Sequence, residues 1–158
     1  MEKNMQHDRS MTQGHYGRLL LMTVLSFMAM YILMYAMVDR LGNVFISVNQ
    51  FYMAALMTAP MVVLELLLMG SMYKDKKLNA ILIGIGVIAL LVFWTLIRQQ
   101  AAVGDRQFLR SMIPHHAGAI LMCEEAGLRE PEVLQLCEGI VSSQQSEIAR
   151  MKSMLAKP

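Results

Sequence analysis

Charged side chains are scarce in this sequence of 158 residues, and two long stretches have none. Only 16% of the residues are charged and 56% are hydrophobic, whereas an ordinary soluble domain is about 45–50% apolar. Residues 19–38 and 78–97 are uncharged, and each is about long enough to cross a hydrocarbon core ~30 Å thick. We predict membrane helices there and a third over 45–69, which is apolar but carries Asn49 and Glu65. One ordinary soluble domain is excluded.

Clusters of basic residues are also absent, which excludes a nucleic-acid interface, and the net charge is only +2. The basic residues near the ends of the predicted spans still give an orientation. One side holds Lys3, Arg9, Arg18, Lys74, Lys76 and Lys77, and the other holds Arg40, Arg98, Arg106 and Arg110. We therefore predict a cytoplasmic tail over 1–18, a membrane region over 19–97, and an extracytoplasmic domain over 98–158. In a bacterium this means the inner or plasma membrane, with that domain periplasmic or extracellular. A cleaved signal peptide is the alternative for the first span, but its apolar run is too long.

The tail over 98–158 has no strand signal, so we predict an all-α protein. Apolar residues at spacings of three and four indicate helices from 105 to about 127 and from 131 to 155. Gly127 is a typical stop signal, and Pro131 suits the first turn of the next helix. Two helices with a short turn form an antiparallel hairpin. Pro114 lies inside the first helix, where it removes a backbone hydrogen bond; alternatively it marks the true start of that helix.

The stretch "RSMIPHHAGAILMC", residues 110–123, combines imidazole and thioether side chains. On a helix Met112 shares a face with His115 and His116, and the antiparallel hairpin places Gln144 to Met151 opposite them. Thioether with imidazole suits Cu(I) or Ag(I), and imidazole with carboxylate suits Cu(II) or Zn(II). The alternative is that the methionines fill the core and the histidines are a surface pair.

The two cysteines, Cys123 and Cys137, lie at similar distances from the predicted turn. Three interpretations remain open: a disulfide that stabilises a small core outside the cytoplasm, a thiolate pair for a soft metal, or two small buried residues.

The segments "DRQFLRSMIPHHAGAILMCEEA" and "PEVLQLCEGIVSSQQSEIARMKSML" together resemble the domain of unknown function 305 family, through M-x-x-H-H and Q-x-x-E-I-x-x-M. The resemblance implies a ferritin-like helical domain that binds copper or silver outside the cytoplasm. It also implies these site residues: Asp105, Met112, His115, His116, Met122, Gln144, Glu147 and Met151. Small residues are usual in that family where the two cysteines stand. No E-x-x-H motif occurs, so a di-iron ferroxidase is excluded.

We therefore expect a membrane-anchored, extracytoplasmic protein that captures or buffers copper, as Cu(I) or Cu(II), and is not an enzyme. Its expected partners are membrane lipid, a soft metal ion, and a second copy or another membrane or metal-handling protein, with no nucleic acid. The alternative is a structural or protein-interaction module without a metal role. Methionines 30, 34 and 37 and methionines 53, 57 and 61 follow helical spacing, which fits either packing or a thioether-lined route. Glu65 is an ionisable group within a span and needs a partner.

Overall fold

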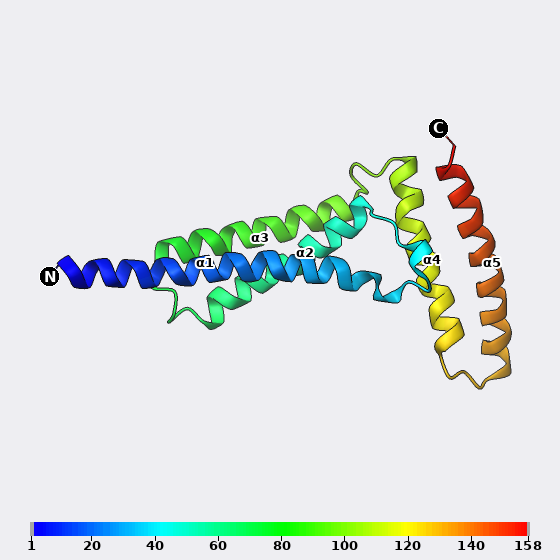
Figure 1. Ribbon diagram of the computed structural model, residues 1–158, viewed down its shortest axis with the longest axis horizontal. Helices are drawn as coiled ribbons and strands as arrows, with labels where there is room; N and C mark the ends of the chain where they lie inside the picture. The colour runs from blue at the N-terminus through cyan, green and yellow to red at the C-terminus, as the bar shows by residue number, and fades with distance from the viewer. Residues whose placement is uncertain (1, 158) are drawn as a thin grey trace. The chain divides into compact units, whose positions relative to one another are not determined.

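The computed structural model describes residues 2–157, with side chains from residue 14 onward, and every regular element in that range is helical (Figure 1). The α-helices are α1 (Glu2–Leu33), α2 (Val48–Leu68), α3 (Lys76–Arg98), α4 (Asp105–Glu125) and α5 (Pro131–Leu155). Two 3-10 turns, η1 (Met34–Met37) and η2 (Leu41–Asn43), lie between α1 and α2. The all-α class predicted from the sequence is confirmed for the described residues.

The chain forms two compact units. The first contains residues up to 32 together with 51–101, and thus most of α1, α2 and α3. Phe51 links these helices, because its ring centroid lies 5.2 Å from that of Phe27 and 6.3 Å from that of Phe93. Gly86 allows α3 to approach α2, since a Cβ there would lie only 2.7 Å from a methyl carbon of Val63.

Three segments are long and apolar enough to cross a membrane: Gly14–Met37, Val48–Leu68 and Lys76–Arg98. They coincide with the three predicted spans to within a few residues. The first helix differs at both ends. Its backbone is already helical from Glu2, where a tail was expected, and its α-helix ends at Leu33, five residues before the predicted end at 38. Residues 34–37 instead form a 3-10 turn, and Val38 is extended.

Glu65 has a partner within this first unit. The Tyr73 hydroxyl donates to Glu65 Oε1 at 3.2 Å, and Tyr73 is almost fully buried. The Asn79 amide donates to the Tyr73 carbonyl at 2.8 Å and accepts from the Tyr16 hydroxyl at 2.6 Å. Glu65 thus receives a hydrogen bond from Tyr73, which is itself held by a polar network at the α2–α3 turn.

Two methionines of the predicted stripes, Met53 and Met57, lie on the surface of the first unit. A groove bordered by α1, α2 and α3 is lined by apolar, small and hydroxyl-bearing side chains, and no methionine is among them. Met53 is 37% exposed and Met57 is 45% exposed. Packing or lipid contact is therefore the better interpretation of these two residues.

The second unit contains residues 33–50 and the chain from 102 onward. Figure 1 shows α4 and α5 side by side, joined by a short turn. Pro131 lies in the first turn of α5, as predicted. Its core is apolar and lies mainly between these two helices: Ile113, Ala117, Ile120, Ile148 and Met151. At the open end the Arg106 guanidinium donates to the carbonyls of Leu155 at 3.1 Å and Lys157 at 3.2 Å, which satisfies orphan carbonyls after α5.

The connection between α1 and α2 packs against this hairpin. Val38 and Phe45 lie against the core, and the Val48 N–H donates to Gln107 Oε1 at 3.1 Å. Gly118 permits close contact, because a Cβ there would lie 3.4 Å from the Met37 carbonyl oxygen. The sequence-based boundary at residue 98 therefore leaves out one part of the unit, because residues 33–50 also pack against the hairpin.

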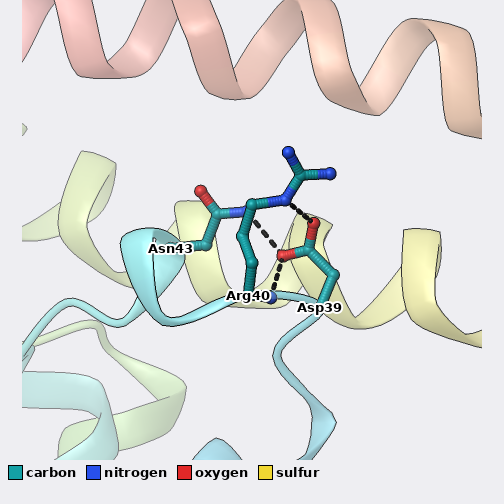
Figure 2. A network of polar contacts seen from close by, with 3 residues as sticks. All are labelled: Asp39, Arg40 and Asn43. Carbon is teal, nitrogen blue, oxygen red and sulfur yellow. Dashed lines mark hydrogen bonds and ion pairs between the residues drawn. The ribbon is translucent and has the colours of Figure 1, made fainter.

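Asp39 organises this connection (Figure 2). Its carboxylate accepts from the Asn43 amide, from the Arg40 guanidinium at 2.7 Å and from the Arg40 backbone N–H at 2.8 Å. The Asp39 side chain is only 3% exposed, whereas that of Arg40 is 64% exposed. Burial alone would raise the pKa of Asp39, but the hydrogen bonds from Asn43 and Arg40 outweigh it and hold this pKa below its ordinary value.

We expect Asp39→Asn to destabilise the second unit by about 2 kcal/mol at neutral pH, since hydrogen bonds to a charged acceptor are lost. The lowered pKa makes the carboxylate stabilising above its unfolded-state pKa, and this contribution disappears as the pH falls through the folded-state pKa. Thermal unfolding of the full chain in detergent should therefore show a wild-type advantage at pH 7 that vanishes in acid. An equal difference at both pH values would contradict this role.

Candidate functional site

A cavity of about 210 Å³ lies between α4 and α5 in the second unit. Seven side chains line it, three from α4 and four from α5: Phe108, Met112, His116, Glu147, Arg150, Met151 and Met154. Three of them are thioethers, one is an imidazole and one is a carboxylate. Most of the lining thus consists of side chains that are able to bind metal ions.

His116 is the most constrained polar side chain of the cavity. It is 7% exposed, its Nδ1 lies 2.9 Å from the Met112 carbonyl oxygen, and its Nε2 lies 2.7 Å from Glu147 Oε2. A carbonyl only accepts, so Nδ1 carries a proton and donates it. Nε2 and Glu147 Oε2 lie within hydrogen-bond distance of each other, so a metal ion that binds Nε2 would have to displace this contact.

Pro114 lies within α4, which continues from Asp105 to Glu125. The alternative that this proline marks the start of the helix is therefore wrong. Because proline has no N–H, the Arg110 carbonyl loses its usual helical partner one and a half turns before His116. Pro114 is itself buried.

The structure brings together four of the predicted site residues: Met112, His116, Glu147 and Met151. It adds three that were not in the predicted set: Phe108, Arg150 and Met154. Two of these additions follow the helical spacing of the predicted residues, because Phe108 precedes Met112 by four positions and Met154 follows Met151 by three. That spacing was the available signal for them. Arg150 gave no comparable signal, since a basic residue is not a metal ligand.

Four other predicted residues do not line this cavity. His115 is exposed, and its ring centroid lies 6.2 Å from that of His116 with the planes at 63°. Neighbouring residues on a helix point about 100° apart, so both imidazoles cannot enter the same cavity. Met122 is 56% exposed, Asp105 is exposed in the first turn of α4, and Gln144 is half-buried on α5.

Cys123 and Cys137 form a disulfide that joins the end of α4 to the first part of α5, with their Cα atoms 5.3 Å apart. Of the three interpretations that the sequence left open, the structure has the disulfide. No cysteine among the described residues is free, and neither cysteine lines the cavity.

Charged and nitrogen ligands are few at the cavity. Across the described side chains there is no group of three or more His, Cys, Asp and Glu residues that could hold a metal ion. Hard and borderline divalent ions depend on such groups, whereas soft ions accept thioethers. The donors present at this cavity therefore favour a soft ion.

The comparisons with known proteins agree with this architecture. The model of a domain of unknown function, DUF305, matches residues 94–155, which include all of α4 and α5. An uncharacterized protein of Acanthamoeba polyphaga mimivirus is 38% identical over 140 residues, covering 87% of this chain and 90% of the relative. Residues 94–155 form a DUF305 domain. The resemblance noted in the sequence is thereby confirmed.

The match to the mimivirus protein is much longer than the DUF305 segment, so it extends into the apolar helices. The alignment with this relative therefore covers parts of both the apolar helical region and the DUF305 segment. No solved structure matches the chain, and the ferritin-like architecture implied by the resemblance stays a prediction.

Proposed function

We propose that this DUF305 protein is a membrane-anchored protein that captures or buffers copper, or silver as its analogue, in the cavity between α4 and α5. One observation carries the proposal: the thioethers of Met112, Met151 and Met154 line the same cavity as His116. The Nδ1 of His116 donates to the Met112 carbonyl, and its Nε2 lies 2.7 Å from Glu147 Oε2. Imidazole ligands are commonly oriented in this way by a hydrogen bond from the second ring nitrogen.

The chemistry of the donors supports a soft ion as cargo. A thioether binds without losing a proton, so Met112, Met151 and Met154 are available at any pH. Glu147 adds a carboxylate that either joins the ion or moves away from Nε2 when the ion arrives. Capture and release need no bond-breaking step, and we therefore propose a carrier or buffer and no enzyme.

The disulfide supports an extracytoplasmic position for the hairpin, because disulfides persist mainly in oxidising compartments. The distribution of lysine and arginine near the spans favours the same orientation, with the N-terminus in the cytoplasm. The three apolar helices would then anchor the hairpin on the extracytoplasmic side of the membrane, where ions from outside the cytoplasm reach it.

A protein-interaction module is the second candidate function, and exposed apolar residues near the start of α5 favour it. Val133, Leu134 and Leu136 are 39%, 43% and 62% exposed. Pairing of two hairpins through this face would give a four-helix arrangement of the ferritin-like type. Such pairing is compatible with metal binding, but an interaction module alone requires no ion.

Replacing His116 and His115 separately tests the proposed function. We expect His116→Ala to lower the affinity for Ag(I) by more than about tenfold, since it removes a ligand and not merely a supporting group. His115→Ala is the matched control, because His115 is exposed and outside the cavity, and it should leave the affinity unchanged. Competition against a chelator, with the full chain in detergent micelles, gives both values. Equal losses, or no loss in either variant, would contradict the proposal.

A further inference from the structure

Two residues that line the cavity have no role in the donor set: Phe108 and Arg150. Phe108 precedes Met112 by four positions and His116 by eight, so α4 presents all three on one face. It is 50% exposed and therefore lies at the rim. Arg150 is also exposed and lies beside Met151 in sequence, three positions after Glu147.

The formal charges at the cavity are those of Glu147 and Arg150, which cancel when His116 is neutral. The guanidinium stays protonated under all ordinary conditions, so its positive charge persists when a cation enters. Its repulsion of the cation grows in proportion to the charge of that cation. A divalent ion is therefore repelled about twice as strongly as a monovalent ion at the same position.

The side chains at the opening of the cavity also favour a monovalent ion over a divalent ion. The face of an aromatic ring attracts a cation without supplying an anionic donor. Phe108 and Met154, which is 40% exposed, also present apolar surface at the opening, where water would otherwise contact the ion. A soft monovalent ion can be bound by thioethers and one imidazole, so it loses little binding free energy when water is excluded from the opening. An ion that requires water or carboxylate ligands loses more binding free energy.

We propose that Phe108 and Arg150 make the cavity selective for a monovalent soft ion, Cu(I) or Ag(I), over divalent Cu(II) and Zn(II). Arg150 acts through its charge, and Phe108 through its ring and its apolar cover. This inference rests on the proposed function, because it needs the ion to lie among Met112, His116 and Met151.

The charge variant Arg150→Gln tests the first part. Arg129→Gln is the matched control, since Arg129 is exposed in the hairpin turn and does not line the cavity. The full chain in uncharged detergent at low ionic strength is titrated with Ag(I) and, separately, with Zn(II). We expect Arg150→Gln to reduce the ratio of Ag(I) affinity to Zn(II) affinity by roughly tenfold, because salt screens the charge of Arg150 only weakly at low ionic strength. The control should leave this preference unchanged.

Two variants at Phe108 test the second part. Phe108→Leu keeps an apolar side chain but removes the ring, and we expect it to lower the Ag(I) affinity roughly threefold. Phe108→Trp retains an aromatic face, so it should retain that affinity. It also places a reporter at the rim when Trp94, the single tryptophan of the chain, is replaced by phenylalanine. Fluorescence of the new tryptophan should change on addition of Ag(I) and much less on addition of Zn(II).

The outcomes separate this inference from the proposed function. If wild type prefers Zn(II), or if neither Arg150→Gln nor Phe108→Leu changes the preference, the selectivity role is overturned while His116-dependent binding still supports a metal site. If wild type binds neither ion, both the inference and the proposed function fail. A preference for Ag(I) that decreases in both variants, with Arg129→Gln unaffected, supports the inference.

Discussion

Replacing Met112 and Met151 together by leucine should lower the affinity of the protein for Ag(I) by more than about a hundredfold, beyond the range usual for losing a supporting group at a metal site. These thioethers come from the two facing helices, and Met151 is 8% exposed at the cavity. Leucine keeps the apolar volume, so each change should cost less than about 1.5 kcal/mol of stability. Loss of binding in a folded variant would then report on sulfur alone, and the competition titration of the full chain measures it.

Met122→Leu is the matched control for this double variant. Met122 is 56% exposed, belongs to the same helix as Met112 and does not line the cavity. Its replacement should leave the Ag(I) affinity unchanged. The chain has 17 methionines, so weak binding at other sites is expected in every variant. Wild-type affinity in the double variant would contradict binding at the cavity between α4 and α5.

Removal of the disulfide should have the largest effect on stability. Cys123 and Cys137 are 14 residues apart in sequence, and a loop of this size corresponds to a stabilisation of about 3 kcal/mol from the restricted unfolded chain. The double variant Cys123→Ser, Cys137→Ser should therefore unfold at a clearly lower temperature. Thermal unfolding of the full chain, followed by circular dichroism in detergent, measures the difference.

A reducing agent supplies the control for this prediction. Reduction should lower the unfolding temperature of wild type to about that of the serine variant, and it should leave the variant itself unchanged. Ag(I) affinity below the unfolding temperature should persist in the variant, because neither cysteine lines the cavity. An unfolding temperature equal to that of oxidised wild type would contradict the stabilising role.

The helices of the hairpin were predictable because their signals are local. Apolar residues at spacings of three and four define α4 and α5, and Pro131 identifies the start of α5. An antiparallel hairpin with a short turn then fixes which residues face each other. That geometry is sufficient to place Met112 and His116 near Glu147 and Met151, as the cavity shows.

The packing of residues 33–50 against the hairpin was not predictable from local signals. Val38 and Phe45 are apolar and adjoin long apolar runs, so the sequence assigned them to membrane helices. Both residues lie at least sixty positions before α4 in the sequence, so no local pattern encodes their contacts with the core of the hairpin. Hydrogen bonds such as that from Val48 to Gln107 are likewise visible only in three dimensions.

The sequence pattern also could not decide which histidine of the pair lines the cavity. His115 and His116 stand together in the motif, and spacing relative to Met112 cannot choose between them, since both three and four residues bring side chains to one face. The rotation of α4 relative to α5 decides the choice. It buries His116 and leaves His115 exposed.

X-ray absorption at the silver edge of the full-length protein, loaded with substoichiometric Ag(I), tests the central claim most directly. Ag(I) needs no reductant, so the disulfide remains intact during the measurement. The account predicts sulfur from more than one methionine together with a single imidazole nitrogen, and loss of that nitrogen in His116→Ala but not in His115→Ala. A shell of oxygen and nitrogen alone, or one that is identical in both histidine variants, would contradict metal binding in the cavity between α4 and α5.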